Sequence, residues 1–164
     1  MENINPGYTY RSTDPSCTAE YLWPAVSGII TTEIKPPGPV FEIGCGNGAF
    51  SKRIASLGYA VTAVDSSETG IEVARHDAGG VRFEVGSGYD DLAATYGPFP
   101  AVVSLEVIEH CFWPRRLVAT AFNLLEPGGV LMLSTPYHGY LKNLVLALFN
   151  RMDFHWSPLW DGGH

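Results

Sequence analysis

The sequence has few cysteines and no long hydrophobic run, and each of these absences excludes a class of protein. Its three cysteines, Cys17, Cys45 and Cys111, are odd in number and match no metal-ligand spacing. The longest apolar stretch, LVLALF at residues 144–149, is much too short to span a bilayer. Because no signal-peptide pattern opens the sequence either, we expect a reducing, cytoplasmic setting.

Positive charge is also scarce. Ten Lys and Arg residues stand against 17 Asp and Glu residues, which gives a formal net charge of −7. Nucleic-acid binding needs basic patches that neutralise phosphates, and the sequence contains no run of Lys or Arg. We therefore expect no nucleic-acid partner, whereas a small cationic ligand fits this charge balance. With 164 residues, 46% of them hydrophobic, the chain is long enough for one domain with its own core.

Apolar strand patterns alternate with helical patterns through most of the sequence. Five strands are predicted, at residues 39–43, 59–65, 81–85, 100–105 and 130–136. Helical patterns are predicted at residues 20–30, 48–58, 66–77 and 114–129, the last one ending at a Pro-Gly-Gly stop. The strands are apolar rather than alternating, which is typical of a sheet covered by helices on both faces. Repeated strand–helix units therefore predict an α/β fold with a Rossmann-like, doubly wound, mostly parallel sheet.

The first predicted strand runs into the segment VFEIGCGNGAF, in which Gly44, Gly46 and Gly48 occupy alternate positions. A strand that leads through glycines into a helix presents free backbone N–H groups, and it lets a ligand lie against the main chain. The loop satisfies the loose dinucleotide fingerprint G-x-G-x-x-G/A, which is a weak signal on its own. A tight turn without a ligand is the alternative.

Two acidic residues near the loop indicate what kind of ligand it binds. Glu42 lies two residues before Gly44, where its carboxylate would repel a pyrophosphate but attract a ligand with an ammonium and a sulfonium group. Asp65 ends the second strand about 20 residues after the first glycine, where a carboxylate can accept both hydroxyls of a ribose. Asp65 fits either ligand, because both kinds of site use such an acid, whereas Glu42 favours S-adenosylmethionine (SAM) over a dinucleotide. An NAD(P)-dependent reductase stays the rival, disfavoured also because no Tyr-x-x-x-Lys pair is present.

Four segments resemble the class I SAM-dependent methyltransferases in order and spacing, over residues 40–136: VFEIGCGNGAF, VTAVDSS, AVVSLEVIEH and LLEPGGVLMLSTP. The E-x-x-E-H run and the L-x-P-G-G turn are most similar to the ubiquinone-biosynthesis O-methyltransferases and the broad methyltransferase type 11 and 12 groups around them. The resemblance implies transfer of a methyl group from SAM to a small-molecule acceptor, at a hydroxyl oxygen. A non-catalytic or partial SAM-binding domain is the alternative.

The resemblance also implies which residues hold the cofactor. Glu42 and the glycine loop, Gly44, Cys45, Gly46 and Gly48, would bind the methionine moiety, and Asp65 the ribose. Ser66 would lie beside the adenosine, and Ser87, Gly88 and Tyr89 would border the adenine. Leu105 and Glu106 would close over the cofactor, and Arg11 would approach it from the N-terminal segment. Ser87 or Asp90 would replace the family's adenine-binding Asp. Arg11 would pair with the cofactor carboxylate, although an ordinary solvated arginine is the alternative.

Candidate catalytic residues follow the fourth and fifth strands, at the sheet edge where open α/β sheets bind ligands. Glu106, Glu109 and His110 form the E-x-x-E-H run, and His110 is a candidate general base. By the resemblance the three residues could instead hold a divalent cation. A purely structural role, with Glu109 capping a helix and His110 packed under a strand, is the third possibility. His138 would either face the acceptor or lie in an exposed loop.

The resemblance divides the chain into an N-terminal lead-in or cap (residues 1–39), a SAM-binding core (40–136) and an apolar helical tail on the acceptor side (137–164). Residues 140–149 are apolar nearly all round, so this helix should be buried or touch something apolar. We favour burial against the sheet, and the resemblance suggests a membrane surface or a lipid-like acceptor instead. The family adds two further strands, which we do not find after residue 136. We therefore expect a truncated, five-stranded sheet whose exposed edge favours a homo-oligomer.

Overall fold

The computed structural model describes residues 9–137 and 139–151. Five strands run through this part of the chain: β1 (Pro39–Ile43), β2 (Ala60–Asp65), β3 (Arg82–Val85), β4 (Phe99–Leu105) and β5 (Leu125–Ser134). The helices are α1 (Ala19–Glu33), α2 (Ala49–Ser56), α3 (Glu68–His76), α4 (Leu92–Tyr96), α5 (Pro114–Asn123) and α6 (Tyr140–Leu148), with a 3₁₀ turn, η1 (Ile108–His110). His138, a predicted catalytic residue, lies outside the described residues.

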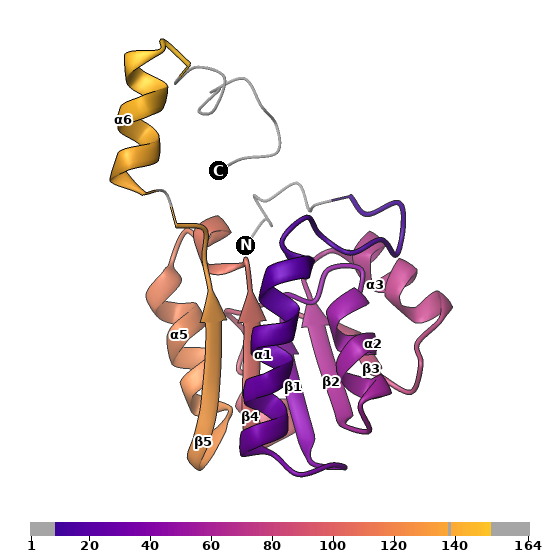
Figure 1. Ribbon diagram of the computed structural model, residues 1–164. Coiled ribbons are helices and arrows are strands. Elements are labelled where there is room, and N and C mark those ends of the chain that lie inside the picture. Colours follow the sequence, from indigo (N-terminus) through magenta and orange to yellow (C-terminus); the bar gives the residue numbers. More distant parts are fainter. Residues whose placement is uncertain (1–8, 138, 152–164) are drawn as a thin grey trace.

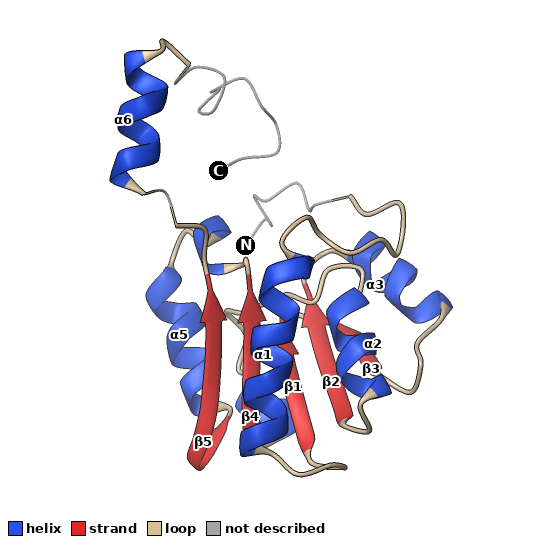
Figure 2. Cartoon of the chain, in the orientation of Figure 1, coloured by secondary structure: helices blue, strands red, loops and turns tan. Residues whose placement is uncertain are grey.

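The strands form one sheet in the order β3-β2-β1-β4-β5, and every pair of neighbours is parallel (Figure 2). The chain moves outward from β1 through β2 to β3, and it then returns to the other side of β1 to form β4 and β5. The carboxyl ends of β1 and β4 therefore border the point where the strand order reverses, which is where open α/β sheets bind ligands. The predicted Rossmann-like, parallel fold is confirmed.

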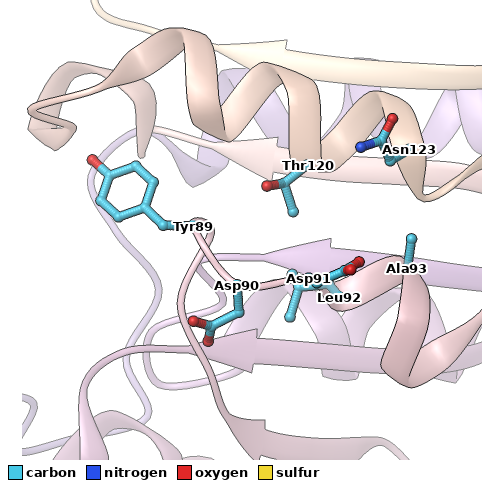
Figure 3. Close-up of a pocket in the computed structure, with 7 residues that line it drawn as sticks. All are labelled: Tyr89, Asp90, Asp91, Leu92, Ala93, Thr120 and Asn123. Carbon is cyan, nitrogen blue, oxygen red and sulfur yellow. The ribbon is translucent and has the colours of Figure 1, made fainter.

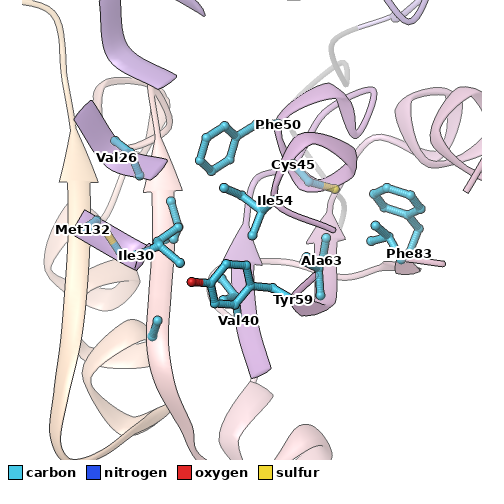
Figure 4. Packing of buried hydrophobic residues seen from close by; sticks show 14 of the residues in the cluster. Val26, Ile30, Val40, Cys45, Phe50, Ile54, Tyr59, Ala63, Phe83 and Met132 are labelled. Carbon is cyan, nitrogen blue, oxygen red and sulfur yellow. The ribbon is translucent and has the colours of Figure 1, made fainter. Parts of the chain in front are cut away.

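Helices cover both faces of the sheet (Figure 1). On one face, Ile30 of α1 and Ile54 of α2 belong to the same buried cluster as Val40 of β1 (Figure 4). On the other face, Leu117 of α5 packs in a second cluster with Phe41 of β1. Alternate residues of β1 thus enter opposite cores, as period-2 geometry requires, which explains why the strand is apolar throughout.

The chain after α5 differs from the sequence prediction. The helical pattern predicted to reach residue 129 ends at Asn123, and β5 begins at Leu125. The reason is a pairing at the start of β4, where the Phe99 N–H donates to the Leu124 carbonyl at 2.7 Å. Regular pairing resumes at Val130, so residues 126–129 form an irregularity inside the strand rather than the end of a helix.

The helix predicted in the tail exists, but its predicted burial against the sheet is wrong. Helix α6 projects away from the sheet (Figure 1), and none of its residues is buried. Leu141 and Leu148 are 72% and 73% exposed. No helix in the described part of the chain combines the length and the apolar character needed to cross a membrane.

Candidate functional site

The glycine loop follows β1 and is fixed to the end of β2. The N–H groups of Gly44 and Cys45 both donate to the Val64 carbonyl, at 2.8 and 3.1 Å. The backbone φ angles of Gly44, Gly46 and Gly48 are 80°, 54° and 76°, in the left-handed region that favours glycine. The alternating glycines are therefore required by the backbone path itself.

Protein side chains also occupy the space that the glycines leave free. A Cβ atom on Gly44 would overlap Val107, and one on Gly46 would lie 2.6 Å from the hydroxyl oxygen of Tyr10. On Gly48 it would lie 2.5 Å from the Phe83 ring. Part of the space that was predicted for a ligand thus holds Tyr10 and Val107, which the sequence did not identify as neighbours of the loop.

Asp65, at the carboxyl end of β2, is joined to the glycine loop. Its Oδ2 atom accepts a hydrogen bond from the Gly46 N–H at 2.7 Å, and its Oδ1 atom accepts one from the Ser67 N–H at 2.7 Å. Burial raises the pKa of the Asp65 carboxyl group, and these two backbone hydrogen bonds act in the opposite direction. The carboxylate is thereby oriented beside the loop.

Glu42 is the buried acid of the site, with only 4% of its surface exposed. Its Oε2 atom accepts a short hydrogen bond from the Ser51 hydroxyl of α2. Burial raises the pKa of Glu42 to about 7; the Ser51 hydrogen bond acts against this shift and the negative charge of Asp65 adds to it. Near neutral pH the carboxyl group is therefore balanced between its neutral and charged forms, and a nearby cation would favour the charged form.

Residues 9–18, which we call the N-terminal strap, lie against the same loop. The side-chain amide of Asn47 donates to the carbonyls of Ser12 and Asp14, both at 2.9 Å. The Tyr10 N–H donates to Thr69 Oγ1 at 3.4 Å, at the start of α3. Arg11, predicted to pair with the cofactor, is exposed at the surface of the strap.

The turn predicted to border the adenine is stabilised by its own polar groups. The Ser87 N–H donates to Asp90 Oδ2 at 2.7 Å, and the Tyr89 N–H donates to Ser87 Oγ at 3.1 Å. A Cβ atom on Gly88 would lie 2.5 Å from Leu117, so this glycine allows close packing against α5. Ser66, after β2, is exposed.

A pocket lies beyond this turn, between the start of α4 and one side of α5 (Figure 3). Its walls combine the end of the turn with residues of both helices: Tyr89, Asp90, Asp91, Leu92, Ala93, Thr120 and Asn123. Only its first two residues belong to the predicted adenine turn, and none belongs to the glycine loop. The pocket therefore adjoins the candidate cofactor site without being that site.

The carboxyl end of β4 carries the predicted catalytic residues. Glu106 directly follows Leu105, which ends β4, and Glu109 and His110 lie in η1. The His110 Nε2 atom is 3.9 Å from Glu109 Oε1, and the side chains are 31% and 15% exposed. No three His, Cys, Asp or Glu side chains among the described residues are grouped so that they could hold a metal ion. The divalent-cation site is thus without support here.

The geometry therefore gathers most of the predicted residues around one sheet edge, and it adds residues that the sequence argument missed. Ser51 binds Glu42, and Ser134 at the end of β5 binds Glu106. Ser51 is fully buried in α2, a helix that also carries Lys52 and Arg53, and Ser134 is the half-buried last residue of β5, so no pattern in the sequence singles out either serine.

Comparison with known proteins identifies the family. The profile of a family described as a methyltransferase domain matches residues 20–161. The chain belongs to this family of class I SAM-dependent methyltransferases. Because this match covers most of the chain, the rival assignment to the NAD(P)-dependent reductases is set aside.

The methyltransferase domain is similar to curated O-methyltransferases. It is 39% identical over 112 residues to the ubiquinone biosynthesis O-methyltransferase of Caulobacter vibrioides, covering 66% of this chain and 44% of the relative. It is 37% identical over 111 residues to that of Xanthomonas axonopodis pv. citri, covering 65% and 46%. The chain thus spans less than half the length of these relatives.

Solved methyltransferase structures share the fold. An amino pentose methyltransferase from Micromonospora echinaspora, solved with SAM bound, has a TM-score of 0.63 at 26% identity, covering 75% of this chain and 52% of that one. The magnesium protoporphyrin IX methyltransferase of Synechocystis PCC 6803, with bound SAH, has a TM-score of 0.64 at 21% identity, covering 82% and 62%. This second likeness concerns the fold alone.

Proposed function

We propose that the protein binds SAM at the glycine loop and transfers its methyl group to a small-molecule acceptor, at a hydroxyl oxygen. The observation that carries this proposal is the pair of acids, Glu42 and Asp65, beside the loop at the reversal point of the sheet. Membership of the methyltransferase family and the similarity to O-methyltransferases support the same reaction.

The residues present fit a cationic nucleoside. Glu42 is an acid whose pKa of about 7 reflects burial, so a positively charged ligand nearby would stabilise its ionised form. Asp65 is oriented by the N–H groups of Gly46 and Ser67, and a carboxylate fixed at this position suits the two hydroxyls of a ribose. When bound, SAM supplies an electrophilic methyl group carried by a sulfonium.

A hydroxyl acceptor must lose its proton during transfer, and His110 is our candidate for the base. The imidazole is half-buried at the carboxyl end of β4, and its Nε2 atom lies 3.9 Å from Glu109 Oε1. A carboxylate at this distance helps to orient the imidazole ring for proton transfer. Glu106, in the same segment, would shape the border between cofactor and acceptor. A structural role for His110 predicts the opposite outcome of the experiment below.

The acceptor side of the domain favours an apolar acceptor or a membrane surface. Helix α6 follows β5, which places it next to the sheet edge that carries the proposed site. Two of its large apolar side chains, Leu141 and Leu148, and the adjoining Phe149 are more than 70% exposed. An exposed apolar patch of this kind marks a partner, lipid or ligand contact. We propose that residues 140–149 contact a lipid-like acceptor or the membrane that contains it.

The cytoplasmic location and the homo-oligomer that we expect from the sequence stay predictions. All three cysteines are free, with Cys45 buried and Cys17 exposed. Strand β5 has no partner on its outer side among the described residues, so the expected pairing with a second copy has an edge available to it.

The experiment combines cofactor binding with methyl transfer. We expect S-adenosylhomocysteine to bind in calorimetry, and labelled SAM to methylate at least one member of a panel of apolar phenols and catechols. The His110→Ala variant should lower turnover at least tenfold with cofactor affinity kept, whereas His76→Ala, at the exposed end of α3, should change neither. Binding without any transfer would support the partial SAM-binding domain instead. Unchanged turnover in His110→Ala would reject the base.

A further inference from the structure

Glu106 has an unusual backbone conformation that one hydroxyl group stabilises. Its φ angle is 57°, in the left-handed region that residues with a Cβ atom rarely adopt. The Ser134 hydroxyl accepts a hydrogen bond from the Glu106 N–H at 2.9 Å and donates one to Glu106 Oε1 at 2.7 Å. A single side chain therefore binds both the main chain and the carboxyl group of the strained residue.

The position of Ser134 follows from the sheet register. Ser134 ends β5 and is paired with Leu105, which ends β4, so its side chain is held next to the residue that leaves the sheet. The contact joins residues 28 positions apart in the sequence. Because strand pairing fixes the Ser134 backbone, the hydroxyl is a rigid anchor for the turn that follows β4.

The turn that begins at Glu106 forms one side of the glycine loop. The next residue, Val107, packs against Gly44 so closely that no Cβ atom could be added there. A change in the Glu106 backbone would therefore move Val107 relative to the loop. Strained backbone of this kind persists only where the surrounding contacts hold it, and it is concentrated at functional sites.

We infer that Ser134 is a positioning residue of the cofactor site, which acts by holding Glu106 and, through it, the turn that packs Val107 on the glycine loop. The inference rests on the proposed function, because it assigns Ser134 to the SAM site. It differs from a merely structural role, since it requires the effect of Ser134 on ligand affinity to pass through Glu106, and in part through the Glu106 side chain.

The test measures the affinity for S-adenosylhomocysteine in the full chain by calorimetry. We expect Ser134→Ala to weaken binding about tenfold, because both hydrogen bonds to Glu106 are lost. Ser134→Thr, which keeps the hydroxyl group, should stay within about threefold of wild type. The matched control is Ser104→Ala in β4, a buried serine whose Oγ has no hydrogen-bond partner within the described ranges, and it should bind normally. If Ser134→Ala fails to fold, Ser134→Cys takes its place, since a thiol donates only weakly.

A double-mutant cycle separates positioning from simple destabilisation. In a Glu106→Ala background, Ser134→Ala should weaken binding by less than it does in wild type, because the carboxyl partner of the hydroxyl is already gone and only the hydrogen bond from the Glu106 N–H remains to be lost. An equal loss in both backgrounds, or wild-type affinity in Ser134→Ala and Ser134→Cys, overturns the inference. Failure of the wild-type protein to bind S-adenosylhomocysteine overturns the proposed function, and the inference with it.

Discussion

The Ser51 hydroxyl of α2 donates a hydrogen bond to the buried carboxyl group of Glu42 on β1. The sequence predicts that Glu42 lies beside the loop to bind a cationic ligand. In the structure, a protein hydroxyl already donates a hydrogen bond to one of its carboxyl oxygens. It satisfies the acid without a positive charge, and burial then raises the pKa of Glu42 to about 7. The site thus contains a carboxyl group whose ionisation depends on what binds near it.

The raised pKa of Glu42 predicts a stability that falls as pH increases. The folded protein favours the protonated acid, so its contribution is fully present below the ordinary pKa of 4.5 and is lost as pH rises to about 7. In urea denaturation, Glu42→Gln should gain stability relative to wild type by about 2 kcal/mol between pH 5 and pH 8. Glu20→Gln on the exposed side of α1 is the control. A parallel pH dependence of wild type and Glu42→Gln would contradict the assignment.

Asp65 should control ligand affinity more than any other residue near the ribose position. Asp65→Asn replaces one acceptor oxygen by an amide donor that faces the N–H groups of Gly46 or Ser67. We expect at least a tenfold loss of S-adenosylhomocysteine affinity, measured by calorimetry. Asp77→Asn, after the end of α3, changes the same charge at an exposed position and should bind normally. Equal affinities of the two variants would argue against Asp65.

Asn47 should hold the N-terminal strap in place. Asn47→Asp keeps the oxygen that accepts from the Ala49 N–H, but it loses the amide donors to Ser12 and Asp14. We expect trypsin to cleave after Arg11 at least threefold faster in this variant, because the strap opens more often. Asn123→Asp on α5 is the control. Cleavage at the wild-type rate in Asn47→Asp would show that other contacts hold the strap.

Helix α6 should bind lipid through its apolar side chains. Leu141→Gln combined with Leu148→Gln removes two of the most exposed apolar groups of the helix. We expect wild type to co-sediment with anionic liposomes at low salt, and the double variant to lose at least half of this binding. Phe122→Gln, which removes a similarly exposed ring from α5, should have no effect. Absence of wild-type co-sedimentation would reject membrane contact.

Much of the fold could be predicted because its determinants are local. Apolar strands without alternation, such as β1, indicate a sheet covered on both faces. The serine pair before α3 offers two N-cap residues, and in the structure Ser67 is the cap, with its hydroxyl accepting from the Gly70 N–H. The end of α5 was placed too late because the pairing of Phe99 with Leu125 begins strand β5 earlier than the Pro-Gly-Gly turn suggests. Such a pairing joins distant residues and leaves no local signal.

The candidate site was predictable in its main-chain elements and less so in its side-chain partners. Gly44, Gly46 and Asp65 were singled out from spacing, since the glycines directly follow β1 and Asp65 ends β2. Ser134 and Asn47 were missed because their partners lie 28 or more positions away in the sequence. Burial of α6 against the sheet was wrongly predicted, because an apolar sequence shows that a helix needs an apolar contact but does not identify the surface that makes this contact.

The most direct test of the account is a calorimetric titration with S-adenosylhomocysteine at pH 6 and pH 8. The pKa of Glu42 in the ligand-free protein is about 7. If the ammonium group of the bound ligand keeps Glu42 ionised, the affinity should rise about tenfold from pH 6 to pH 8, and binding at pH 6 should release a proton. Glu42→Gln should bind with no such pH dependence. No binding at either pH, or the same pH dependence in Glu42→Gln, would contradict the claim that this acid and the glycine loop form the cofactor site.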